Sequence, residues 1–282
     1  MKCYICGESN FLVRKGEVRD LPETKIYECP TCGLVFLDSF EHIHDAFYED
    51  SPIVGPIHST IDAWLRITEI DDQRRFEKFA WSLGGKKVLD FGCGAGGFLI
   101  KCKEVSEISD GIEPEKQISE YWKGELNIWQ GFDDIPKGNK YDLITAFHVL
   151  EHLHEPREVL KSMVDFLEKD GKIIVEVPSS EDALLSLYDS AVFQRFTYWS
   201  QHLYLYNMAC LERLAKQAGL RVVTTQYYQR YPLSNHLYWL SKGLPGGHEQ
   251  WGFLDSPELT QAYGNALASV GKCDTLIAYL EV

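Results

Sequence analysis

Residues 88–99 read VLDFGCGAGGFL and combine an apolar strand, a glycine-rich turn and the start of a helix. Gly92, Gly94 and Gly96 allow the backbone to turn with positive φ, and they let a ligand approach without side chains in the way. A strand, a glycine turn and a helix in this order are typical of a cradle for a nucleoside cofactor. We therefore expect the fold and the site to be built outward from this stretch.

Two carboxylates accompany the glycine turn and help to identify the cofactor. The run GCGAGG also satisfies the pattern GxGxxG, which fits a nicotinamide cofactor as well as S-adenosylmethionine. Asp90 ends the strand just before the turn, where its carboxylate suits a cationic amino group and would repel a pyrophosphate. This position favours the amino-acid end of S-adenosylmethionine. Glu113 follows the apolar stretch 108–112, at about the spacing at which a carboxylate binds ribose hydroxyls, which both cofactors would accept.

Two further segments carry a resemblance to a known family. Residues 141–156 read YDLITAFHVLEHLHEP, and residues 171–178 read GKIIVEVP. With the glycine turn, they resemble the fourth and fifth strands of class I S-adenosylmethionine-dependent methyltransferases, and the resemblance extends over roughly residues 86–227. It implies an α/β Rossmann-like fold, a largely parallel sheet with an antiparallel last strand, and a methyl donor at the carboxyl ends of the strands.

The same resemblance implies which residues bind the cofactor. Phe132 and Asp133 lie in the turn GFDD, where the family commonly places an apolar contact and a carboxylate for the adenine. The expected cofactor-binding residues come from the end of the first strand, the glycine turn, the acidic residue after the second strand with its neighbour, and the adenine contact. They are Asp90, Gly92, Gly94, Gly96, Glu113, Pro114, Phe132 and Asp133.

The composition excludes several classes of function. The chain has 282 residues, 45% of them hydrophobic, and a formal net charge of −14. It should be globular and would repel a polyphosphate backbone, so we expect a small-molecule substrate and not a nucleic acid. No basic and apolar leader occurs, and no run of about 18 or more apolar residues, so we expect a cytoplasmic protein that does not span a membrane. The composition leaves the oligomeric state open.

Four of the eight cysteines form two CxxCG pairs near the N-terminus. Cys3 and Cys6 are separated from Cys29 and Cys32 by 22 residues, and each pair is followed by a glycine that permits a tight turn. Four thiolates at this spacing predict a closed tetrahedral site for structural zinc. Residues 1–38 should then form a zinc ribbon too short to bury a core alone, so metal binding would supply much of its folding free energy. Free thiols and redox activity are the alternatives.

The remaining chain divides around the core. Residues 39–85 predict a helical connector with a helix over 61–80, and Tyr48 and His58 are either cap residues over the cofactor or ordinary surface positions. The methyltransferase domain should span 86–282, with insertions near 178–206 and 229–272 over the rim of the site. A helix is expected over 208–218. Strands are expected at 87–91, 108–112, 126–129, 141–147, 171–177, 221–228 and 274–281.

Histidines supply the candidate catalytic groups. If the chain turns helical after the fourth strand, His148 and His152 share one helix face and Glu151 lies beside His148. One histidine would then remove the acceptor's proton while Glu151 orients it. Two alternatives stay open: Glu151 and His152 hold the loop by hydrogen bonds, or they ligate a divalent ion, as such a pair does in some O-methyltransferases that the chain resembles. His202, in the first insertion, is either part of the substrate site or structural.

These observations favour a methyltransferase that uses S-adenosylmethionine and acts on a small-molecule acceptor. A sugar or sugar nucleotide is a candidate acceptor because a four-cysteine module followed by this core resembles enzymes that methylate nucleotide-linked sugars, and O-methylation is favoured. One alternative is an RNA methyltransferase whose ribbon docks RNA. The others are a binding protein that keeps the fold without catalysis and, last, a dehydrogenase.

Overall fold

The fold is organised around one mixed β-sheet. The computed structural model describes residues 1–43 and 60–282, so Tyr48 and His58 lie outside the described residues. Within 60–282, the sheet has seven strands in the order β10 (Arg221–Tyr228), β11 (Thr275–Glu281), β8 (Leu167–Pro178), β7 (Tyr141–Phe147), β4 (Lys87–Phe91), β5 (Ile108–Ile112) and β6 (Asn127–Trp129). Neighbouring strands from β8 to β6 are parallel, whereas β11 is antiparallel to both β8 and β10. The predicted Rossmann-like fold with an antiparallel last strand is confirmed.

The strands form where the sequence predicts them because their apolar runs are buried. In β4, Val88, Leu89 and Asp90 are all buried, as expected for a central strand covered on both faces. The main difference is β8, which begins at Leu167 and not at residue 171. Leu167 pairs with Tyr141 across a register irregularity, so β8 adds residues before the predicted apolar run.

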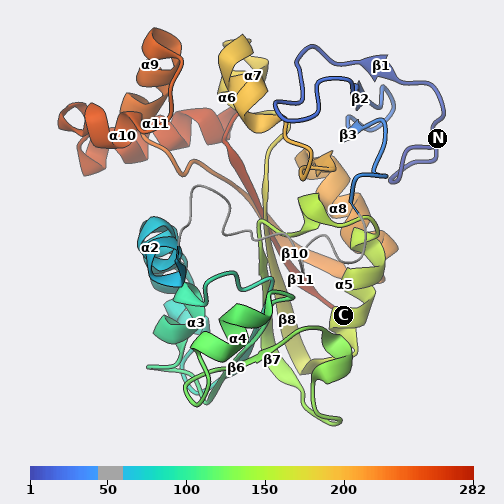
Figure 1. Cartoon of the computed structure of the whole chain (residues 1–282), viewed down its shortest axis with the longest axis vertical. Coiled ribbons are helices and arrows are strands. Elements are labelled where there is room, and N and C mark those ends of the chain that lie inside the picture. The colour runs from blue at the N-terminus through green and yellow to red at the C-terminus, as the bar shows by residue number, and fades with distance from the viewer. Residues whose placement is uncertain (44–59) are drawn as a thin grey trace.

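Helices cover both faces of the sheet (Figure 1). One face carries α2 (Ile61–Phe79), α3 (Gly97–Cys102) and α4 (Lys116–Tyr121), and the other carries α5 (Pro156–Val164) and α8 (Met208–Gln217). The predicted helices at 61–80 and 208–218 are thus confirmed within one residue. Asn207 caps α8 by accepting a hydrogen bond from the amide of Cys210 at 2.8 Å, and the helix buries Leu211 and Leu214 toward the sheet.

Both insertions lie at the end of the sheet where β8 ends (Figure 1). The first insertion contains α6 (Ala183–Ser186), α7 (Ala191–Thr197) and β9 (Tyr204–Leu205). The second contains α9 (Leu233–Lys242), α10 (Gly247–Gln250) and α11 (Pro257–Ser269). Short 3-10 helices occur at Ala80–Ser82, Phe132–Asp134, Leu150–His152 and Gly252–Leu254.

The N-terminal ribbon is joined to the first insertion. Its strands β1 (Leu12–Val13), β2 (Ile26–Glu28) and β3 (Val35–Leu37) form an antiparallel sheet whose fourth strand is β9. Asn207 donates to the carbonyl of Cys32 at 2.9 Å, and the Ser200 hydroxyl donates to Asp20 at 2.7 Å. The ribbon therefore shares a sheet and side-chain hydrogen bonds with the first insertion. The domain boundaries at residues 38 and 85 stay predictions.

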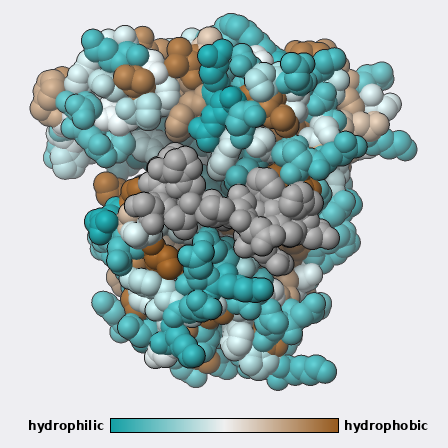
Figure 2. Space-filling view, viewed as in Figure 1, coloured by the Kyte–Doolittle hydropathy of each residue, from teal (hydrophilic) through white to brown (hydrophobic). Residues whose placement is uncertain are grey.

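The face of the molecule drawn in Figure 2 is mostly hydrophilic outside the grey region. Figure 2 shows one face on which polar residues dominate and apolar residues occur in small, separate groups. Among the helices of residues 1–43 and 60–282, none is long and apolar enough to cross a membrane.

Candidate functional site

The glycine turn after β4 has the conformation that the sequence predicts. Gly92, Gly94 and Gly96 have φ values of 73°, 53° and 83°. A Cβ atom at Gly92 would lie 2.5 Å from Val149 Cγ2, and one at Gly96 would lie 2.6 Å from Trp122 Nε1. Backbone conformation and close neighbours therefore both select glycine here. The turn connects β4 to α3 at the carboxyl edge of the sheet.

Asp90 and Glu113 lie buried on either side of this turn. Asp90 is 3% exposed and accepts a hydrogen bond from the Thr145 hydroxyl at 2.6 Å. Glu113 is 4% exposed and accepts hydrogen bonds from the amides of Gly94 at 3.0 Å and Glu115 at 3.4 Å. Burial raises the pKa of each carboxyl group to about 7. Burying an acid is unfavourable without a partner, so the two positions are suited to a cationic or hydroxylated ligand.

α2 covers the glycine turn, a contact that the sequence did not reveal. A Cβ atom at Gly94 would meet the ring of Trp64 at 3.0 Å, and one at Gly97 would lie 2.2 Å from Asp72 Oδ2. α2 thus packs directly on the glycine turn and on the start of α3. The helical spacing of Trp64 predicts a buried position, but it does not specify the partner.

The expected adenine contact lies after β6. Phe132 stacks between Phe91 and Phe166, with ring centroids 5.1 Å apart in both pairs, and is half-buried. Asp133 is exposed, and Pro114 is half-buried next to Glu113. The cofactor roles of these residues, like those of Asp90, Glu113 and the glycines, stay predictions.

The segment after β7 differs from the predicted helix. His148 has φ 56°, in the left-handed region, and the 3-10 helix Leu150–His152 follows it. His148 and His152 therefore do not share a helix face. Instead, Glu151 is completely buried between them, with Oε1 3.3 Å from His148 Nδ1 and 3.9 Å from His152 Nε2.

His148 is held by charged groups on three elements. Its Nε2 lies 3.3 Å from Glu176 Oε1 on β8 and 3.1 Å from Arg230 Nη1, just beyond β10. Burial and Arg230 oppose the protonated form, but hydrogen bonds to Glu151 and Glu176 outweigh them and raise the pKa of His148. Arg230 carries no sequence motif, so its position beside His148 is evident only from the structure.

Charged residues also attach α2 to this cluster. Glu176 accepts hydrogen bonds from Arg74 Nη2 at 2.8 Å and Arg75 Nη2 at 2.9 Å, and Asp71 pairs with Arg230. The two arginines and His148 keep the pKa of the buried Glu176 well below its usual range, although burial alone would raise it. These ion pairs fix α2 against the strand ends that carry the site.

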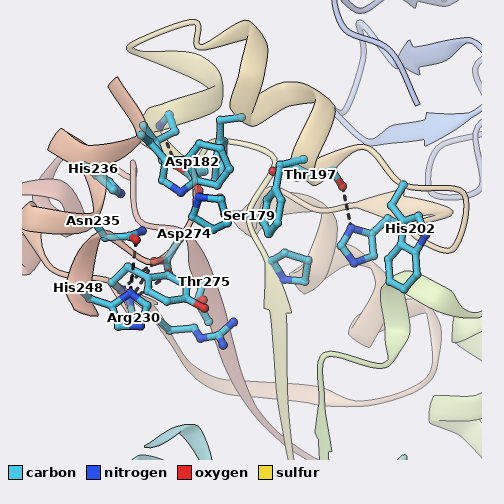
Figure 3. A pocket seen from close by; sticks show the side chains of 18 of the residues that line it. Ser179, Asp182, Thr197, His202, Arg230, Asn235, His236, His248, Asp274 and Thr275 are labelled. Atoms are coloured by element: carbon cyan, nitrogen blue, oxygen red, sulfur yellow. Dashed lines mark hydrogen bonds between the residues drawn. The ribbon is translucent and has the colours of Figure 1, made fainter. Parts of the chain in front are cut away.

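A cavity of about 350 Å³ opens next to His148, at the carboxyl ends of β8 and β10. Its apolar walls come from both insertions: Phe193, Phe196, Trp199, Tyr231 and Trp239. His148 and His202 line it, whereas His152 does not. Figure 3 shows His202 at one end, Arg230, His236 and His248 at the other, and Ser179, Asp182, Asp274 and Thr275 between them.

The ribbon also contributes to this cavity. Arg19 lines it, with its guanidinium 4.7 Å from the ring centre of Trp199 and a hydrogen bond to the carbonyl of Phe196 at 3.3 Å. Nothing in the sequence around Arg19 predicts this position, because it depends on how the ribbon packs on the first insertion.

The four ribbon thiols converge as the CxxCG spacing predicts. The sulfur atoms of Cys3, Cys6, Cys29 and Cys32 all lie within 4.8 Å of one another, including separations of 3.5 Å for Cys3–Cys32 and 3.4 Å for Cys6–Cys29. Tetrahedral zinc with Zn–S bonds of about 2.3 Å places its sulfurs about 3.8 Å apart, so the four residues fit the metal. Gly7 and Gly33, with φ 76° and 77°, make the turns that the motif requires.

Comparison with known proteins gives a family and several relatives. The family model described as a methyltransferase domain matches residues 66–225, more than half of the chain. Among curated proteins, the ubiquinone biosynthesis O-methyltransferases of Glaesserella parasuis and Marinobacter nauticus are 28% and 25% identical over 49% and 48% of this chain. The matches span only 61% and 58% of those relatives' own lengths.

Solved structures agree on the fold. An S-adenosylmethionine-dependent methyltransferase from Archaeoglobus fulgidus has a TM-score of 0.52 and 18% identity, and the match covers 76% of this chain and 94% of that one. A Haloferax volcanii methyltransferase, solved with the Trm112 methyltransferase activator, also has a TM-score of 0.52, with 15% identity and coverage of 78% and 96%. The chain therefore belongs to the methyltransferase-domain family and has the class I S-adenosylmethionine-dependent methyltransferase fold.

Proposed function

We propose that this protein transfers a methyl group from S-adenosylmethionine to a hydroxyl oxygen of a small-molecule acceptor. The observation that carries the proposal is the cavity of about 350 Å³, which opens beside His148 at the same sheet edge as the glycine turn. A donor site and an acceptor cavity at one edge are what an in-line transfer requires, since catalysis then consists largely of alignment and exclusion of water. The acceptor class to test first is a sugar or sugar nucleotide, for which the aromatic walls would provide stacking surfaces.

The chain's own residues would hold the cofactor at the tips of β4, β5 and β6. Asp90 would bind the ammonium group of the amino-acid end, and Glu113 the ribose hydroxyls. The turn formed by Gly92, Gly94 and Gly96 would bring its backbone close to the ligand, and Pro114, Phe132 and Asp133 would border the adenine. When bound, S-adenosylmethionine supplies an electrophilic methyl group. The buried carboxyl groups of Asp90 and Glu113 support this assignment.

His148 would accept the proton that the acceptor hydroxyl loses. It lines the cavity, and Glu151 at 3.3 Å from its Nδ1 would stabilise the imidazolium and fix the ring. His152 would act on the loop instead, because its Nδ1 is hydrogen-bonded to the carbonyl of Gln201 at 2.8 Å and it does not line the cavity. The named activity of the curated relatives, O-methylation, supports an oxygen acceptor.

Replacing His148 with asparagine should lower kcat by about 10²- to 10⁴-fold, the usual contribution of general acid–base catalysis. Asparagine tolerates the left-handed backbone of this position, so the fold should persist. S-adenosylmethionine affinity should stay within about threefold, because His148 contributes to proton transfer. His248→Asn, at the other end of the cavity, is the control. Turnover of His148→Asn within threefold of wild type would exclude the histidine as the base.

We propose that the ribbon binds one zinc ion with a structural role. Four cysteine ligands leave no open coordination position for a substrate, which supports a structural and not a catalytic ion.

Isothermal titration with S-adenosylmethionine and S-adenosylhomocysteine tests the donor assignment directly. We expect one site per chain for each ligand, with an affinity that is independent of any acceptor. Absence of binding by the intact, folded protein would overturn the proposed function.

A further inference from the structure

One carboxyl group on the wall of the acceptor cavity is buried without a cation beside it. Asp182 follows β8, is 5% exposed and lines the cavity (Figure 3). Its Oδ1 caps α6 by accepting a hydrogen bond from the amide of Leu184 at 2.7 Å. In the part of the chain that the structure describes, Oδ2 has no hydrogen-bond partner, and no basic side chain forms an ion pair with Asp182. The ammonium group of Lys272 pairs with the neighbouring Glu181 instead.

A second carboxyl group, that of Asp274, faces the same cavity and adds to the negative charge. Burial, and to a lesser extent the charge of Asp274, raises the pKa of Asp182 well above its usual range. Asp274 itself accepts hydrogen bonds from the amides of Arg230 and Tyr231 at 3.0 and 3.2 Å. The guanidinium of Arg230 pairs with Asp71 on α2. The arginine at this side of the cavity is therefore already engaged by another carboxylate.

The remaining basic groups of the wall do not neutralise Asp182 either. Arg19 lies at the end of the cavity that His202 occupies, since its guanidinium is 4.7 Å from the ring centre of Trp199, which is 5.7 Å from that of His202. Burial lowers the pKa of His236 to about 4, so this histidine is neutral near pH 7. A cation for Asp182 has to come from a ligand.

The aromatic part of the wall favours the same kind of ligand. Phe193 and Phe196 both pack on Trp239, with ring centres 5.2 and 5.1 Å from that of the indole. An ammonium group is stabilised by aromatic faces and by a charge-assisted hydrogen bond to a carboxylate. A phosphate or carboxylate would be repelled by Asp182, and a neutral hydroxyl would leave its charge uncompensated.

We infer that the acceptor carries a protonated amine, which binds to Oδ2 of Asp182 while the hydroxyl to be methylated faces His148. This inference rests on the proposed function, because it assigns the charge of the acceptor in that same cavity. The ammonium group supplies both the N–H donor and the positive charge that the wall lacks. A volume of about 350 Å³ lies at the lower end of the range of small-molecule sites, so the acceptor is a small hydroxylated amine, such as an amino sugar.

Two matched pairs of probes test the inference on the full-length protein: glucosamine with glucose, and tyramine with tyrosol. Within each pair, an amine in one probe replaces a hydroxyl in the other, and near pH 7 both amines are largely protonated. Isothermal titration in saturating S-adenosylhomocysteine measures the four affinities. In at least one pair we expect the amine to bind at least about 10-fold more tightly than the hydroxyl compound, the usual effect of a hydrogen bond to a charged group.

The variant Asp182→Asn should reduce this preference to within about threefold. Asparagine keeps an oxygen that can cap α6, so the change removes the charge and not the cap. Glu181→Gln is the matched control, because it removes the adjacent carboxylate, which pairs with Lys272 and does not line the cavity. It should keep the full preference. Unchanged tryptophan fluorescence shows that a variant keeps its fold, and if Asp182→Asn fails this check, Asp182→Ser, which also caps a helix, decides.

Titration of S-adenosylmethionine on the same preparations separates this inference from the proposed function. If the cofactor binds but neither amine binds, or no pair shows a preference, or the preference survives in a folded Asp182 variant, then the amine site is wrong and the methyltransferase proposal stands. If the amine preference depends on Asp182 but the cofactor does not bind, the amine site stands and the proposed function is wrong.

Discussion

The double variant Cys6→Ser and Cys29→Ser should lose acceptor turnover by at least about 100-fold while it still binds S-adenosylmethionine within about threefold of wild type. Structural zinc contributes on the order of 10 kcal/mol or more to the folding of such small modules, so the ribbon should unfold without it. The glycine turn, Asp90 and Glu113 belong to the central sheet, which does not depend on the ribbon for its strands. Zinc content by elemental analysis, steady-state kinetics and isothermal titration measure the three quantities.

The reason for this selective loss lies in how the ribbon supports the acceptor cavity. β3 pairs with β9, the Cys32 carbonyl accepts from Asn207, and Asp20 accepts from Ser200, so the ribbon holds the first insertion in place. Arg19 of the ribbon is itself part of the cavity wall. Neither substituted side chain supplies any of these contacts, so their loss must act through the metal.

Cys273→Ser is the matched control because it removes a buried thiol that is not part of the ribbon. Cys273 follows the second insertion directly in the chain. It should leave zinc content and the acceptor KM unchanged. If the double variant loses its zinc and still turns over acceptor at the wild-type rate, then the ribbon does not position the cavity. If it loses cofactor binding as well, the ribbon supports the whole fold and not one site.

The substitution Asp90→Asn should weaken S-adenosylmethionine binding by at least about 100-fold and, at the same time, stabilise the ligand-free protein above pH 7. The first effect follows from removing the charge that pairs with the ligand's ammonium group in a buried site. Asparagine keeps an oxygen that accepts from Thr145, so the strand should be undisturbed.

The second effect follows from proton linkage. Burial raises the pKa of Asp90 from 3.8 to about 7, so the folded state binds its proton more tightly than the unfolded state. The stability that this proton provides is fully present below pH 3.8 and is lost as the pH rises through about 7. Above that pH the wild type buries a carboxylate, which costs on the order of a few kcal/mol, whereas the variant stays neutral.

Thermal unfolding of both ligand-free proteins at pH 5 and pH 8 measures this difference. At about 2–4 °C per kcal/mol for a domain of this size, the variant should gain roughly 5 °C or more in Tm at pH 8, and much less at pH 5. Thr145→Val provides the comparison, since it removes the hydrogen bond and leaves the carboxyl group. An equal Tm difference at both pH values would show that the change acts through packing and not through the charge.

The fold could be predicted because its signals are local. The glycines of residues 92–97, the buried run of β4 and the apolar runs of β5 and β7 each specify their own conformation within a few residues. Alternation of such strands with helices restricts the sheet to a few topologies, and the family resemblance selects one of them. The same locality explains the ribbon thiols, since the CxxCG turns need only their own glycines.

The conformation of the segment from His148 to His152 could not be predicted from local sequence alone. The spacing of His148 and His152 predicts one helix face, but the hydrogen bond from the His148 amide to the Glu176 carbonyl extends the parallel pairing with β8. His148 then adopts φ 56°, and Glu151 turns inward between the two rings. The competing interaction comes from a strand that is distant in sequence, so periodicity alone did not reveal it.

The sequence by itself determined the sheet, the nucleotide turn with its two acidic positions, and the four-thiol ribbon, because each depends on conformational preferences within a short segment. Only the tertiary structure decided that His202 faces Glu151, that Arg230 reaches His148, and that the ribbon forms a sheet with β9. These contacts join segments that are far apart in the chain. Their free energy comes from burial and charge pairing, which no local pattern encodes.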